Sequence, residues 1–113
     1  MIKSNIFRYA TFNLAAGAGA NTALYTVLPQ NIVVVNKFRS SVMTNGYYSY
    51  CQLMRGGVTL VVITGLSSAE SDISDSFDLS FLAGDVITLG SYNQNAGATT
   101  YYVSFRATLY SNI

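Results

Sequence analysis

The residues best able to carry chemistry in this sequence are its five carboxylates, which all fall between Glu70 and Asp85. Several carboxylate oxygens on one flexible segment can bind Ca²⁺, and the candidate ligands are Glu70, Asp72 and Asp75. Their spacing lacks the glycine and the terminal glutamate of an EF-hand loop. Clustered like charges usually face water, so the sequence favours a solvated acidic loop, and we expect no cofactor.

Catalysis is not expected from the remaining side chains. The chain has no histidine, which removes the commonest general base and excludes a Ser-His-Asp triad. A carboxylate pair could serve glycoside hydrolysis only if one pKa were raised, and a polar loop offers nothing to raise it. Cys51 is the single cysteine, so no intrachain disulfide can form, and we interpret it as a small buried side chain in a strand. We therefore expect a protein that is not an enzyme.

Composition limits the other classes of function. A chain of 113 residues can bury one core, so we expect a single domain spanning 1–113. Charged residues make up only 10% of the chain, whereas soluble domains carry about 25%. Other copies of the chain, or other proteins, should therefore cover part of its surface. The net charge of +1 gives no reason to expect binding to nucleic acid or to a membrane, and the apolar run 58–63 is too short to span a bilayer.

The segment 76–92 carries the clearest β-pattern. Its apolar residues at 77, 79 and 81 alternate with polar ones, as in a strand with one buried face. Gly84 can adopt a positive φ and Asp85 can hydrogen-bond its own backbone, so the chain should turn there before the pattern resumes at Val86. We interpret this segment as a β-hairpin. Asn45-Gly46, a dipeptide preferred in two-residue turns, predicts another hairpin.

Similar patterns recur along the rest of the chain, separated by turn residues at intervals of about ten residues. The small-residue stretch 15–20 and the polar stretch 65–75 are expected to be connections. This pattern predicts an all-β fold, a jelly-roll-like antiparallel β-sandwich of about eight strands. Strands are expected at 6–14, 23–27, 32–39, 47–54, 58–63, 76–81, 86–92 and 99–110.

The strand at 58–63 is apolar on both faces, although a sandwich strand offers only one face to its own core. Side chains at 58, 60 and 62 point one way, and those at 61 and 63 point the other way. Leaving such side chains in water forgoes several kcal/mol at about 25 cal/mol per Å². We therefore predict self-association. The predicted interface consists of Val58, Leu60, Val61, Val62, Ile63, Tyr101, Phe105 and Leu109.

Tyrosine is abundant, with nine residues in the chain. Its amphipathic ring suits protein interfaces and sugar stacking, although β-propensity alone explains many of these residues. The polar turn after Tyr92 adds side-chain amides that could hydrogen-bond a sugar. The candidate ligand-binding residues are Tyr92, Asn93, Gln94 and Asn95. A carbohydrate- or receptor-binding module on a fibre tip is thus an alternative function.

Two stretches of the sequence resemble a known family. Thr22-Ala-Leu-Tyr-Thr-Val-Leu-Pro-Gln-Asn-Ile-Val-Val-Val-Asn36 resembles the opening of small bacteriophage β-sandwich virion proteins. Phe81-Leu-Ala-Gly-Asp-Val-Ile-Thr-Leu89 resembles a strand pair of the same proteins, which also occurs in trimeric jelly rolls similar to C1q and tumour necrosis factor.

The resemblance implies a location in the virion and a structural role as a capsid decoration protein, a head fibre or a tail-associated component. It also implies contacts with other virion proteins and self-association as a homotrimer. A secreted trimeric ligand of the C1q type would need a signal peptide, and the first residues of this chain do not resemble one.

Overall fold

The computed structural model describes residues 1–42, 48–66, 68–72 and 79–112, and these residues form strands and no helix. Over that part of the chain, accordingly, no helical segment has the length and hydropathy needed to cross a bilayer. The strands are β1 (Ile2–Leu14), β2 (Gly19–Thr26), β3 (Asn31–Val42), β4 (Tyr48–Arg55), β5 (Val58–Leu66), β6 (Ser68–Asp72), β7 (Leu79–Leu82), β8 (Val86–Tyr92) and β9 (Thr99–Ser111).

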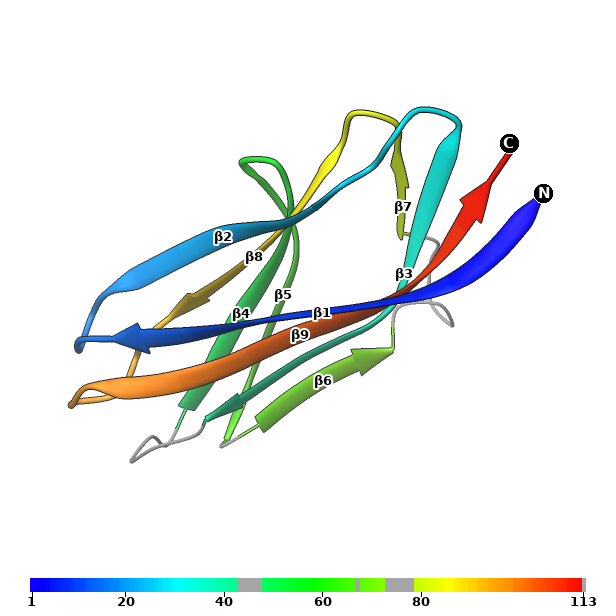
Figure 1. Cartoon of the computed structure of the whole chain (residues 1–113). Helices are drawn as coiled ribbons and strands as arrows, with labels where there is room; N and C mark the ends of the chain where they lie inside the picture. The colour runs from blue at the N-terminus through cyan, green and yellow to red at the C-terminus, as the bar shows by residue number, and fades with distance from the viewer. Residues whose placement is uncertain (43–47, 67, 73–78, 113) are drawn as a thin grey trace.

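The strands form two antiparallel sheets that lie face to face (Figure 1). Sheet A has the order β1-β9-β3, and β6 and β7 follow one another along the other edge of β3. Sheet B has the order β2-β8-β4-β5. The chain changes sheet at every connection except those from β4 to β5 and from β6 to β7, which is the connectivity of a jelly roll. The predicted fold class is therefore confirmed.

The prediction of a β-hairpin at 76–92 is wrong. β7 pairs with β3 in sheet A, whereas β8 pairs with β2 and β4 in sheet B. The turn between β7 and β8 therefore carries the chain across the sandwich instead of back along the same sheet. Gly84 has the expected positive φ, 91°. Alternation and turn chemistry specify where the chain reverses, but they do not specify which sheet the next strand joins. Asn45-Gly46 lies outside the described residues, and the flanking strands β3 and β4 also belong to different sheets.

Arg55, at the end of β4, stabilises the crossing from β7 to β8. Its Nη2 donates to the carbonyl of Ser80 at 2.6 Å, and its Nε lies 3.3 Å from Oδ2 of Asp85. The same carboxylate oxygen accepts a hydrogen bond from the backbone N–H of Leu82 at 2.9 Å. The guanidinium also lies 5.0 Å from the ring centroid of Phe81. One cation thus links sheet B to the turn that joins the two sheets.

Strands occupy parts of both segments that were expected to be connections. β2 begins at Gly19, inside the small-residue stretch, and β6 forms within the polar stretch 65–75. β6 pairs with β3, and the register places Asp72 opposite Lys37 and Glu70 opposite Arg39. A free edge of a sheet can supply backbone hydrogen bonds to a polar segment. Hydrophobic alternation carries no information about such a strand.

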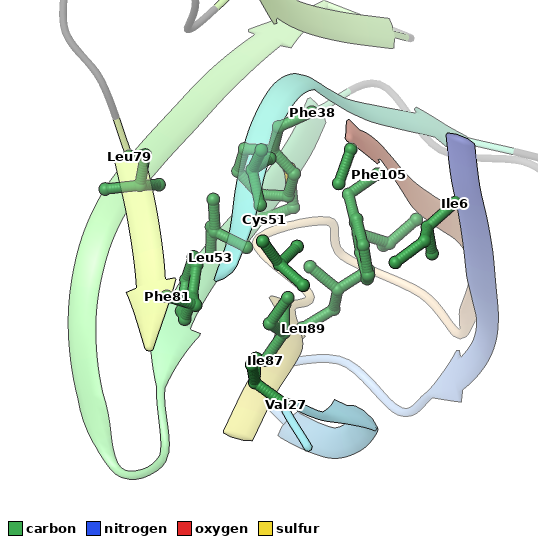
Figure 2. Close-up of a cluster of buried hydrophobic side chains, with 14 of the residues drawn as sticks. Ile6, Val27, Phe38, Cys51, Leu53, Leu79, Phe81, Ile87, Leu89 and Phe105 are labelled. Atoms are coloured by element: carbon green, nitrogen blue, oxygen red, sulfur yellow. The ribbon is translucent and has the colours of Figure 1, made fainter. Parts of the chain in front are cut away.

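The core fills the space between the two sheets, where side chains from both converge (Figure 2). In β9 alternate residues point inward, from Tyr101 through Val103 and Phe105 to Ala107, and all four are buried. In β1, Ile6, Phe12 and Leu14 are buried in the same way. The largest fully buried side chains are Tyr101, Phe38, Phe81, Phe105, Leu53, Ile87, Leu89, Val27, Val33, Val35 and Val103.

Cys51 is fully buried on the core face of β4, which confirms its interpretation as a small buried side chain. Burial raises the pKa of its thiol to about 12, and a hydrogen bond with the side chain of Ser40 offsets only part of this effect. The thiol therefore stays protonated in the folded protein.

Replacing Cys51 by alanine should flatten the alkaline pH dependence of stability. The thiol ionises near pH 9 in the unfolded chain and only near pH 12 in the folded protein. Its contribution to the free energy of unfolding is therefore constant below about pH 9 and falls between about pH 9 and 12, by up to about 1.4 kcal/mol per pH unit. Urea titrations at about pH 8 and pH 10 should show a larger loss for the wild type than for Cys51→Ala, and equal losses would contradict the prediction.

Candidate functional site

The outer face of sheet A carries a hollow of about 440 Å³ that is both cationic and aromatic. The strand register places Phe7 opposite Arg106 and Arg106 opposite Lys37, so one row across β1, β9 and β3 supplies its centre. The guanidinium of Arg106 lies 4.9 Å from the ring centroid of Phe7. The residues that line the hollow are Phe7, Lys37, Arg39, Ser41, Tyr102, Ser104 and Arg106.

The structure describes the strand positions of two of the three acidic residues considered as calcium ligands. Glu70 and Asp72 belong to β6, where their register partners in β3 are the cations Arg39 and Lys37. Asp75 lies outside the described residues. Among the residues that the structure describes, no group of three metal-ligating side chains occurs. For this set, calcium binding therefore stays an alternative to a solvated acidic segment.

The outer face of sheet B carries a groove of about 460 Å³ with a different chemical character. The rings of Tyr50 and Tyr92 meet edge to face, with centroids 6.0 Å apart. Nε2 of Gln52 donates to the Tyr50 hydroxyl at 3.5 Å, and the Ser91 hydroxyl donates to the Tyr50 carbonyl at 2.7 Å. The lining residues are Gly19, Ala20, Asn21, Tyr50, Gln52, Ser91, Tyr92 and Gln94, and none of them is charged.

The four candidate ligand-binding residues divide between this groove and the protein interior. Tyr92 and Gln94 line the groove and are exposed. Asn93 is fully buried, because successive residues of an extended chain point to opposite sides. Asn95 is half-buried, and its Nδ2 donates to the hydroxyl of Tyr101 at 2.9 Å. The prediction was therefore wrong in including Asn93 as a ligand contact.

Asn93 instead joins four parts of the chain through its side-chain amide. Its Nδ2 donates to the carbonyls of Leu14 at 3.0 Å and Gly97 at 2.9 Å. Its Oδ1 accepts from the backbone N–H of Asn95 at 2.9 Å and from the hydroxyl of Tyr101 at 3.1 Å. Burial raises the pKa of the Tyr101 phenol above its usual value, so this hydroxyl stays protonated and able to donate.

The predicted interface residues also divide between core and surface. Tyr101 and Phe105 are fully buried inside the sandwich and cannot contact another chain. The half-buried residues Leu60, Val61, Ile63 and Leu109 all pack against the core. Val61 and Ile63 do so because their register partners, Leu53 and Cys51, are core residues. Val58 and Val62 remain exposed, at 64% and 45%, and for them the interface stays a prediction.

A second exposed apolar patch lies on sheet A and was not predicted. Ile32 in β3 lies directly opposite Leu82 in β7, and both side chains are exposed. Leu28, in the turn before β3, is exposed as well. The sequence signal was present, because the run of apolar residues that begins at Ile32 leaves an apolar side chain on each face of the strand.

Comparisons with known proteins give the fold and no family. No family model matches the chain, and no curated protein matches it. The capsid asymmetric unit of cyanophage Pam1 contains a chain that is similar to it with a TM-score of 0.59 and 12% sequence identity, over 97% of this chain and 85% of that chain. At this identity the likeness establishes the shared fold alone.

Two further solved structures are more distant in geometry. A chain from Bacillus endospore appendages, described as disulfide-linked pili, has a TM-score of 0.48 and 15% identity, over 100% of this chain and 93% of that chain. The virus-like particle of the extra small virus of the giant freshwater prawn Macrobrachium rosenbergii has a TM-score of 0.40 and 10% identity, over 95% of this chain and 80% of that chain.

Replacing Asn93 by leucine should lower the free energy of unfolding by at least about 2 kcal/mol. The substitution removes two donors and an acceptor, and each buried group left without a partner costs about 1–3 kcal/mol. Urea denaturation of Asn93→Leu and of the exposed control Asn21→Ala provides the measurement. The control should change stability by no more than about 0.5 kcal/mol. A similarly small change for Asn93→Leu would show that the amide network contributes little.

Proposed function

We propose that this chain is a non-enzymatic structural protein of a bacteriophage particle, in which copies of it associate with one another and with other virion proteins. The shared fold with a chain of the cyanophage Pam1 capsid asymmetric unit supports a place in the virion. The resemblance described from Thr22 onward supports a decoration, head-fibre or tail-associated component and a trimeric state. The absence of histidine from the sequence supports a role without catalysis.

The observation that carries this proposal is the lack of protection along the edge strand β5. β5 is the last strand of sheet B, so one of its backbone edges pairs with no other strand of the described chain. Its sequence, from Val58 to Leu66, contains neither a charge nor a proline. Proteins that remain monomeric usually place such residues on exposed edge strands to prevent pairing with another chain.

The other sheet edges are protected, which makes β5 the exception. β1 carries Lys3 and Arg8, and Arg8 lies over the ring of Tyr25 with its guanidinium 5.4 Å from the centroid. β6 carries two carboxylates, and β7 is only four residues long. β2 has an irregularity in its pairing between Ala23 and Tyr25. An unprotected edge with outward valines suits a contact between subunits, by strand pairing or by apolar packing.

Val62→Lys should convert an oligomer into a folded monomer. Val62 is exposed, so a lysine there should change the stability of the fold by no more than about 0.5 kcal/mol, whereas a buried unpaired ammonium would disrupt a contact between chains. Sedimentation velocity at micromolar concentration should give the mass of three 12.2 kDa chains for the wild type and of one for Val62→Lys.

The matched control is Thr11→Lys, which adds the same charge at an exposed position of β1 and should leave the wild-type mass unchanged. Circular dichroism should show the same β-spectrum for all three proteins. If the wild-type protein is monomeric at micromolar concentration, the prediction of self-association is wrong. If the Val62→Lys variant is oligomeric, the contact between subunits does not involve β5.

A further inference from the structure

The groove on the outer face of sheet B borders the edge strand β5, because Gln52 in its lining is the register partner of Val62. It is built from β2, β4 and β8, which lie side by side in the sheet (Figure 1), whereas the unprotected strand β5 lies at the sheet edge. Its volume of about 460 Å³ lies within the range of about 300–1,000 Å³ found for ligand pockets.

We propose that this groove binds a neutral carbohydrate. A sugar ring has an apolar face of C–H groups and a rim of hydroxyls, each of which can both donate and accept a hydrogen bond. The ring of Tyr92 supplies an amphipathic surface for the C–H face. The side-chain amides of Asn21, Gln52 and Gln94 supply donors and acceptors for the hydroxyls.

The lining of the groove argues against other ligand classes. None of the described lining residues is charged, so a phosphate, a sulfated sugar or a nucleic acid would find no cation to pair with. A purely apolar ligand would remove the amides from water without replacing their hydrogen bonds. A neutral ligand rich in hydroxyls needs no cation, and it can replace the hydrogen bonds that the amides lose with water.

Two glycines set the shape of the groove floor. A Cβ atom added to Gly90 would lie 2.9 Å from Oε1 of Gln52 and 3.3 Å from the carbonyl oxygen of Ala20. A Cβ added to Gly19 would lie 3.2 Å from Cδ2 of Tyr92. The missing side chains let the Gln52 amide and the Tyr92 ring lie close against the sheet.

Contacts within the protein hold the aromatic part of the groove in place before any ligand arrives. Tyr92 packs against Gly19 and meets the ring of Tyr50, yet 41% of its surface remains exposed. Tyr50 is fixed in turn by its hydrogen bonds with Gln52 and Ser91. A rigid aromatic surface lowers the entropy lost on binding, which favours recognition of a ligand that offers only weak individual contacts.

The test uses the 113-residue chain and a glycan array that carries neutral glycans of glucose, galactose, mannose and N-acetylglucosamine beside sialylated and sulfated glycans. We expect saturable binding to at least one neutral glycan, and the corresponding free sugar should compete with that binding. Tyr92→Ala should weaken that binding about tenfold, whereas Tyr92→Phe, which keeps the ring, should stay within about threefold of the wild type. Tyr9→Ala, which removes an exposed tyrosine from sheet A, should leave binding unchanged.

Several outcomes would overturn the proposal: no saturable binding to any neutral glycan, a preference for the anionic glycans, or undiminished binding by Tyr92→Ala. Gln94→Ala provides a second variant at an exposed position outside the strands, and it should weaken binding about threefold. Sedimentation of each variant tests the assembly separately. A variant that loses glycan binding but keeps the wild-type oligomeric mass is defective in the groove alone.

Discussion

The apolar layer between the two sheets is the constraint on which the rest of this structure depends. Phe38 and Phe105 from sheet A and Leu53 and Leu89 from sheet B are fully buried in it (Figure 2). Because consecutive strands mostly belong to different sheets, neither sheet can form from a local segment of the chain. The layer fixes one face of each strand and leaves the other free to vary, so a cationic, aromatic face and a neutral groove can occur on one sandwich.

The sequence predicted the class of fold well because the core requires strict alternation. The inward residues of β9, from Tyr101 to Ala107, follow directly from a period of two. Alternation does not specify sheet membership, which is why the turn at Gly84 was interpreted as a hairpin and not as a crossing. It also cannot reveal β6, a polar segment that pairs with the edge of β3.

The surfaces were only partly predictable, for a similar reason. Tyr92 and Gln94 lie close together in sequence and both line the groove, but Tyr50, Gln52 and Asn21 reach it only through the strand order of sheet B. Asn93 could have been excluded by the same alternation, since its neighbour Tyr92 points outward. On β5 one face was expected to meet the core, and the register identifies it as the face of Val61 and Ile63. The exposed apolar positions are therefore Val58 and Val62.

The central place of β9 in sheet A has a consequence for how the protein is made. β9 pairs with β1 along its whole length and with β3 on its other side. The pairing with β1 places Ile2, near the start of the chain, opposite Ser111, near its end. A ribosome releases β1 and β3 long before β9, so two long strands wait with unsatisfied edges during synthesis. Such distant pairing makes folding slow, and the waiting edges can recruit another nascent chain.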